Sequence, residues 1–299
     1  MTLTKNINRI TEPIFVIALS LICLYFSKRS FIFIGMIPIL FAIFYFNEGI
    51  LSFLLAACGT YFLGLVFVDR DALTMSLIPL LLIGLSLIIL IGLKFSARVE
   101  IIATFVITSI IFIFLYKYRM LEEGLSLDSL AVNLKESFES TYPYSLDFEI
   151  YRLTVGLYPS ILGFLSMIYS ILSVKLIRNY LSIKDENYTD ITNLDELRMN
   201  QKDLIILILV DLVIFYLGKF FGLKEVYLFG NLLLLTMMFF IINGASLFDY
   251  MLKNSSIPLT RSFQWFFMLI LIQVLIIPLV IFGFLDVFLD FRARRKNEK

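Results

Sequence analysis

Long apolar runs separated by short polar stretches dominate the chain. A bilayer core of about 30 Å is crossed by about 20 helical residues, and several of the runs have that length. The runs are continuously apolar and do not alternate, so they fit helices and not the strands of a membrane barrel. The pattern predicts an all-α fold, a polytopic integral membrane helix bundle of eight to nine hydrophobic helices. The runs are 13–27, 31–46, 50–68, 73–93, 99–116, 153–175, 203–221, 226–248 and 263–285.

Two connections between the runs are longer than turns. Within 117–152, apolar residues recur every three or four positions from Leu127 to Phe138, which predicts a short amphipathic helix. Tyrosines around Pro143 then favour a position at the level of the lipid headgroups. The connection 176–202 is polar and charged. We therefore expect an N-terminal membrane bundle of six helices at 1–175, a polar loop at 176–202, and C-terminal membrane helices with a basic tail at 203–299.

The distribution of lysine and arginine gives an orientation, because these residues gather in cytoplasmic loops. Nine full crossings divide the 25 basic side chains almost evenly between the two sides. Eight crossings, with run 203–221 kept on the inner side, place most of them inside. We therefore expect both termini to be cytoplasmic and the 117–152 connection to lie outside.

The amino-acid composition excludes several kinds of binding and catalysis. Hydrophobic residues make up 60% of the chain and charged residues 16%, as in proteins whose solvent is lipid. The net charge of +1 offers no electrostatic basis for binding nucleic acid. Histidine is absent and both cysteines lie in apolar runs, which removes Ser-His and Cys-His catalysis and the common zinc sites. We therefore expect no enzyme activity, no metal and no cofactor.

A few polar side chains lie within or beside the runs, where an ionisable group costs at least about 2.5 kcal/mol. If run 203–221 crosses, Asp211 faces protein or a water-filled space, and if the run is interfacial, Asp211 faces water. Asn231 either bridges helices or contacts a ligand, and Gly244 favours a close helix contact. The candidate binding residues are Glu48, Tyr158, Asp211, Asn231, Gly244, Asp249 and Trp265.

The C-terminal stretch PLVIFGFLDVFLDFRARR places charges where an apolar run leaves the membrane. On one continuous helix, Asp286, Asp290 and Arg294 fall at i, i+4 and i+8 and form one polar stripe. The basic side chains favour anionic lipid of the inner leaflet. The pattern predicts a membrane-exit anchor, with partner docking or gating as the alternative. The residues assigned to this role are Asp286, Asp290, Arg292, Arg294 and Arg295.

Three stretches also carry a resemblance in their order along the chain. They are ITEPIFVIALSLICLYF near the N-terminus, YRLTVGLYPSILGFLSMIYSILSVKLIR in the middle, and NLLLLTMMFFIINGASLFDYMLKN before the C-terminal stretch. Together they resemble the YybS-like family of bacterial membrane proteins, a domain of unknown function. The resemblance implies the bacterial cytoplasmic membrane and brings no assigned activity. The N-terminal part is similar in layout to S components of energy-coupling-factor transporters, although their small-xxx-small docking motif is incomplete here, with Ile22 following Ala18.

Two functions fit these features. A small-solute binding or transport component would surround its ligand with polar and aromatic side chains. Its energy would come from a partner or a gradient, because no nucleotide-binding motif occurs in the sequence. A structural or regulatory scaffold would instead have a dry, packed bundle and bind partners through its cytoplasmic loop and tail. We expect the first, with the lipid bilayer, a small molecule or another membrane subunit as partners.

Overall fold

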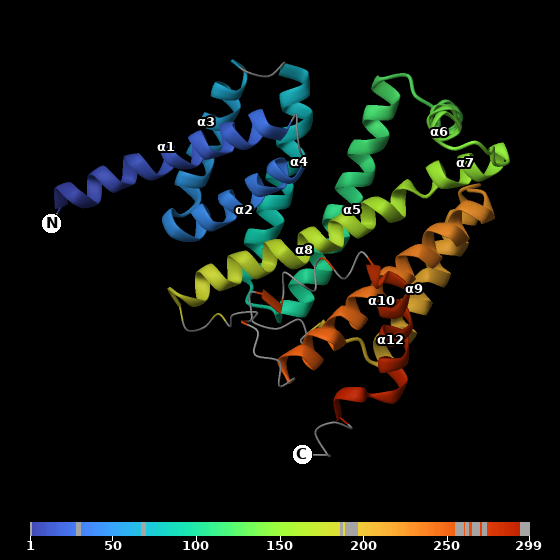
Figure 1. Ribbon diagram of the computed structural model, residues 1–299. Helices are drawn as coiled ribbons and strands as arrows, with labels where there is room; N and C mark the ends of the chain where they lie inside the picture. Colours follow the sequence, from blue (N-terminus) through green and yellow to red (C-terminus); the bar gives the residue numbers. More distant parts are fainter. Residues whose placement is uncertain are drawn as a thin grey trace. The chain divides into compact units, whose positions relative to one another are not determined.

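The computed structural model is all-helical, as the continuous apolar runs predicted (Figure 1). Within the described part of the chain it contains eleven helices and no strand. The structure describes residues 2–27, 31–66, 70–185, 188, 197–254, 260, 263–264, 270 and 274–293. The helices are α1 (Thr2–Ser27), α2 (Phe31–Glu48), α3 (Ile50–Gly64), α4 (Arg70–Gly92), α5 (Ala97–Glu122), α6 (Leu127–Thr141), α7 (Phe148–Gly156), α8 (Tyr158–Ser182), α9 (Gln201–Phe220), α10 (Glu225–Lys253) and α12 (Ile276–Leu289).

The helices reproduce the apolar runs that lie in the described residues. Four spans are long and apolar enough to cross a bilayer, and they fall in α4, α5, the α7–α8 pair and α10. Shorter apolar helices make up most of α1, α2, α3 and α12. Helix α9 covers run 203–221 and belongs to neither group, since it carries Asp203, Asp211 and Lys219. Run 263–285 lies partly outside the described residues.

The predicted amphipathic helix in the first connection is confirmed as α6, Leu127–Thr141. It starts at a capping box in which the backbone N–H of Ser129 donates to Ser126 Oγ at 3.0 Å. The N–H of Ser126 donates in return to Ser129 Oγ at 2.8 Å. The helix ends at Thr141, and the extended backbone of the next residue, Tyr142, is the conformation that the following Pro143 favours.

Run 153–175 begins with a helix break. Helix α7 ends at Gly156, Leu157 forms a turn, and α8 begins at Tyr158. Pro159 fits the first turn of α8, where its missing N–H is no loss. Helix α8 then continues to Ser182, seven residues beyond the predicted end of the bundle at residue 175.

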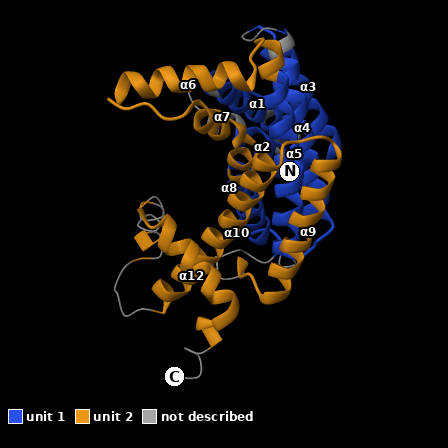
Figure 2. Cartoon of the chain, turned by 90° about the vertical axis from the view of Figure 1, so that its right-hand side faces the viewer, with its two compact units in different colours: residues 1–118, 165–190 blue, residues 119–164, 191–299 orange. Residues whose placement is uncertain are grey.

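The chain divides into two compact units (Figure 2). Unit 1 contains residues 1–118 and 165–190, and unit 2 contains residues 119–164 and 191–299. This division differs from the predicted boundaries at 175 and 203, because helix α8 supplies its first residues to unit 2 and the rest to unit 1. In unit 1, α2 packs against α1, α3 and α4, and the buried ring of Phe41 meets Phe53 edge-on at 5.8 Å. In unit 2, α10 packs against α9 and most extensively against α12.

Candidate functional site

Helices α10 and α12 approach each other backbone to backbone at two glycines. A Cβ atom on Gly244 would overlap the carbonyl oxygen of Leu279, and a Cβ on Gly283 would overlap the carbonyl oxygen of Phe240. Only residues without a side chain allow this approach. The close helix contact predicted at Gly244 is therefore confirmed, and Gly283 is its partner.

Asn243 lies beside the glycine contact and is 1% exposed. Its Nδ2 donates to the carbonyl oxygen of Gly283 at 2.7 Å, and its Oδ1 accepts from the backbone N–H of Met199 at 2.9 Å. Because both ends of the amide are bonded, Asn243 ties α10 to α12 and to the segment that precedes α9. Buried amides with satisfied partners stabilise apolar bundles in this way.

A buried charge pair lies near the C-terminal end of the same crossing. Asp286 of α12 is completely buried, and its Oδ2 lies 3.3 Å from Nη2 of Arg292. The same Nη2 donates to Ser246 Oγ at 3.1 Å. The backbone N–H of Phe291 and the guanidinium of Arg292 approach the carboxylate of Asp286, but within the described residues neither contact reaches the geometry of a normal hydrogen bond. A carboxylate has about four acceptor positions, so Asp286 retains capacity for a further donor.

Helix α10 presents one polar face to this pair. Asn243, Ser246 and Asp249 follow one another at three-residue spacing, and all three are buried. Tyr250 adds a hydroxyl that donates to the backbone carbonyl of Arg292 at 3.3 Å. We call Asn243, Ser246, Asp249, Asp286 and Arg292 the unit 2 polar centre. The sequence prediction included Asp249 and assigned Asp286 and Arg292 to the membrane surface, while it missed Asn243 and Ser246, whose spacing was the available signal.

The prediction of one continuous helix through Asp286, Asp290 and Arg294 is wrong. Helix α12 ends at Leu289, and Asp290 takes a left-handed conformation with φ 45° and ψ 60°. Aspartate tolerates this conformation better than most residues, so the chain can turn here. The turn brings Arg292 back onto Asp286, where its side chain is buried in protein and not placed against lipid. Arg294 and Arg295 lie outside the described residues.

Asp290 has a different partner from Asp286. Its Oδ2 lies 2.7 Å from Nη2 of Arg198, a residue of the segment before α9. The hydrogen bond from Arg198 lowers the pKa of Asp290 below its ordinary value. Asp286 and Asp290 thus enter two separate ion pairs and do not form a shared stripe.

Asn231 bridges helices, one of its two predicted roles. Its Oδ1 accepts from Ser160 N at 3.0 Å and from Ser160 Oγ at 2.7 Å. Its Nδ2 donates to the carbonyl oxygens of Gly156 at 3.0 Å and Tyr227 at 2.8 Å. The amide joins α10 to the α7–α8 break, and these bonds occupy its donors and acceptor.

The remaining described candidate residues lie on separate helices. Asp211 accepts a hydrogen bond from Thr236 at 2.6 Å, while Glu48 ends α2 in unit 1. Tyr158 begins α8, and Trp265 lies outside the described residues. Along α10 alone, Asn231 and Asp249 are about 27 Å apart at 1.5 Å per residue. Among the described residues of the predicted binding set, Asp249 belongs to the unit 2 polar centre, and Gly244 lies at the helix contact beside it.

Unit 1 holds a second buried ion pair that the sequence prediction missed. Arg178 of α8 donates from Nε to Glu100 Oε2 at 2.7 Å and from Nη2 to Oε1 at 2.9 Å. Glu100 is completely buried, and Arg178 also donates to the carbonyl oxygen of Phe95. The glutamate lies at the start of an apolar run and its partner 78 positions away, so spacing gave no signal.

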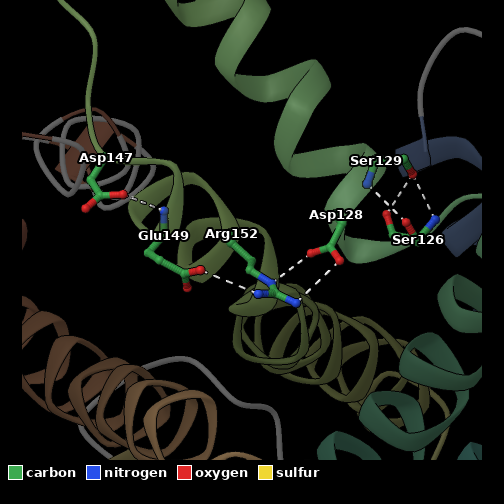
Figure 3. A network of polar contacts seen from close by, with 6 residues as sticks. All are labelled: Ser126, Asp128, Ser129, Asp147, Glu149 and Arg152. Atoms are coloured by element: carbon green, nitrogen blue, oxygen red, sulfur yellow. Dashed lines mark hydrogen bonds and ion pairs between the residues drawn. The ribbon is translucent and has the colours of Figure 1, made fainter.

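A surface network holds α6 against α7 (Figure 3). Nε of Arg152 lies 2.8 Å from Asp128 of α6, and its Nη1 lies 3.5 Å from Glu149 of α7. Asp147 caps α7 by accepting from the N–H of Glu149. Both acidic partners of Arg152 are more than half exposed, so each pair contributes about 1 kcal/mol or less. The network positions the two helices and offers no enclosed site.

Apolar helices that satisfy their own backbones, joined at buried ion pairs and glycine contacts, define a multi-pass membrane protein. A model of one family matches residues 14–287, and its description is "Predicted membrane protein (DUF2232)". The chain belongs to this family, which agrees with the resemblance found in the sequence. No curated protein and no solved structure matches the chain.

Proposed function

We propose that the chain is a non-catalytic membrane component that binds a small solute at the unit 2 polar centre. The observation that supports this proposal is the buried carboxylate of Asp286 at an apolar helix crossing. Its contact with Arg292 is 3.3 Å long, and no hydrogen bond from the described residues completes its shell. Buried carboxylates without full hydrogen bonding are costly, so this arrangement favours an additional donor.

The chemistry of the centre selects the class of solute. Arg292 contacts both Asp286 and Ser246, and the two carboxylate oxygens of Asp286 retain acceptor capacity. A solute with an ammonium or other hydrogen-bond-donating group therefore complements the carboxylate of Asp286. Since the sequence holds no nucleotide-binding motif, transport would draw on another membrane subunit or an ion gradient. We place the protein in the bacterial cytoplasmic membrane with both termini cytoplasmic.

The test measures the melting temperature of the purified chain in detergent with a panel of solutes. Glycine, lysine, choline and ammonium supply cationic groups, and acetate and phosphate supply anions. We expect at least one cationic solute to raise Tm saturably in the wild type and not in Asp286→Asn, which keeps the shape of the side chain. Asp290→Asn is the control, and it should retain the response. Equal responses in wild type and Asp286→Asn would contradict the proposal.

The competing scaffold function makes a different prediction for the same experiment. A dry, packed bundle would show no saturable response to any solute, and truncation of the tail would leave Tm unchanged while abolishing partner capture. The lengths of the Asp286 contacts favour the solute-binding function, because a scaffold gains nothing from an incompletely bonded carboxylate.

A further inference from the structure

Arg198, in the segment before α9, brings another arginine to the charges around the unit 2 polar centre. Its Nη2 lies 2.7 Å from Asp290 Oδ2, and its guanidinium also interacts electrostatically with Asp286. The backbone N–H of the next residue, Met199, donates to Asn243 at 2.9 Å and holds this segment against α10. Arg198 therefore belongs to the same group of charges as Asp286.

One N–H of the Arg198 guanidinium lacks an acceptor. A side-on arginine–carboxylate pair uses Nε and Nη2 together, as Arg178 does with Glu100 at 2.7 and 2.9 Å. Asp290 forms only half of such a pair, and its other oxygen, Oδ1, accepts the backbone N–H of Ala293 at 3.1 Å. Within the described residues, the buried Nε of Arg198 makes no hydrogen bond. A buried donor without an acceptor is unfavourable, so Arg198 favours a further acceptor.

Asp286 has unused acceptor positions where Arg198 has an unused donor. In the described part of the chain no hydrogen bond joins the two side chains, so they act on each other across a gap. A cation between them would satisfy Asp286 and leave Nε of Arg198 without an acceptor. An anion would satisfy Arg198 and leave Asp286 incompletely bonded. A single ligand that carries both an ammonium and a carboxylate completes both groups.

We propose that the solute of the unit 2 polar centre is a small zwitterion, whose ammonium binds Asp286 and whose carboxylate binds Arg198. The inference rests on the proposed function and adds the negative group of the solute to it. Each charge of a zwitterion meets a charge of the opposite sign, so binding adds no uncompensated charge to the buried centre. An amino acid is the simplest solute of this class.

The experiment compares solutes that share an amine and differ in the carboxylate. The pairs are glycine with methylamine and lysine with cadaverine, and each solute is titrated against Tm of the purified full chain in detergent. In at least one pair, we expect the amino acid to give half of its maximal Tm rise at a concentration about tenfold or more below that of the amine.

Arg198→Gln removes the charged donor from a side chain that is 33% exposed. It should abolish the preference for the amino acid and keep the response to the amine, which depends on Asp286. Arg152→Gln is the matched control, because Arg152 pairs with acidic residues of unit 2 outside the polar centre. This variant should keep the wild-type preference.

Two outcomes would overturn the zwitterion and leave solute binding intact. One is an equal half-saturating concentration for amino acid and amine in both pairs. The other is an Arg198→Gln protein that keeps the preference for the amino acid. Arg198→Lys serves as the second test variant if Arg198→Gln does not fold, since its single nitrogen bonds Asp290 and no second donor remains. If neither amines nor amino acids raise the wild-type Tm, the solute site itself is wrong and the zwitterion fails with it.

Discussion

Asp290 leaves the helical conformation at the end of α12, and its left-handed backbone determines where the neighbouring charges go. With α12 continued, Arg292 would point away from Asp286, since residues six apart lie on different faces of a helix. The turn at Asp290 instead folds Arg292 back into the buried centre and leaves Asp290 to pair with Arg198. A single backbone conformation thus separates two carboxylates that spacing alone would align.

The Arg198–Asp290 pair predicts a pH dependence of stability. The pKa of Asp290 is lowered from its ordinary value of 3.8, because Arg198 stabilises the charged form. A lowered folded pKa means that the contribution is present above pH 3.8 and is lost as the pH falls through the folded pKa. Asp290→Asn removes the charge and keeps a residue that tolerates the left-handed backbone.

We expect Asp290→Asn to lower the free energy of unfolding at pH 5–7 by about 1 kcal/mol or less, because the pair is partly exposed. The difference from the wild type should disappear as the pH falls below about 3.8. Chemical denaturation in detergent across this range measures it. If the difference in free energy of unfolding between the two proteins stayed constant down to pH 2–3, the loss of stability would come from the backbone turn and not from the charge.

At the scale of helices, the α10–α12 crossing requires glycine on both helices, because the two backbones are in contact. Gly244→Ala would drive a methyl group into the carbonyl oxygen of Leu279, which is backbone and cannot rotate away. The helices must separate, and the bonds of Asn243 to Gly283 would lengthen with them. Overpacking of this kind costs about 1–3 kcal/mol, and a backbone collision lies at or above the upper end.

Gly92→Ala is the matched control for Gly244→Ala. Gly92 ends α4, and a Cβ there would meet no atom within 4 Å. Alanine has a higher helix propensity than glycine by about 1 kcal/mol, so Gly92→Ala should be neutral or slightly stabilising. Unfolding in detergent with increasing denaturant compares the two variants. If both glycine variants retained wild-type stability, the backbone contact at Gly244 would not hold in solution.

Elements were predictable from sequence where local signals agreed. The three- and four-residue spacing from Leu127 to Phe138 predicted α6, and this signal is local, as is the cap that Ser126 forms in the structure. The end of α12 had no such signal, because no glycine or proline occurs between Gly283 and Asp290. The turn at that point depends on Arg198 and Ser246, which lie far away in the sequence. Pairings of this range cannot be read from the spacing of residues.

At the scale of the whole molecule, the apolar runs predicted the class of fold. The buried polar groups join particular helices to one another. Asn231 was predictable as a polar group within an apolar helix, and bridging was one of its two expected roles. Glu100 and Arg178 lie at run ends, where charges normally meet water, and their burial follows only from tertiary packing. Individual polar groups within apolar runs were therefore predictable from sequence, whereas their partners were not.

The number of crossings determines the orientation of the chain in the membrane. The span Phe148–Ser182 separates the first connection from the second, so single cysteines at Ser140 and Ile183 should lie on opposite sides. If α9 stays on the inner side, α10 and the last apolar run return the chain to the cytoplasm, and Ala293 lies on the same side as Ile183. The charges at Asp203, Asp211 and Lys219 favour this interfacial position for α9.

Labelling with an impermeant thiol reagent in intact cells tests this arrangement in a Cys23→Ser, Cys58→Ser background. We expect Ser140→Cys to be labelled, and Ile183→Cys and Ala293→Cys to be labelled only after permeabilisation. Labelled Ala293→Cys with protected Ile183→Cys would mean that α9 crosses the bilayer, which would place Asp211 at membrane depth. In that case the bond between Asp211 and Thr236 would be a helix contact within the bilayer, where an ionisable side chain costs at least about 2.5 kcal/mol.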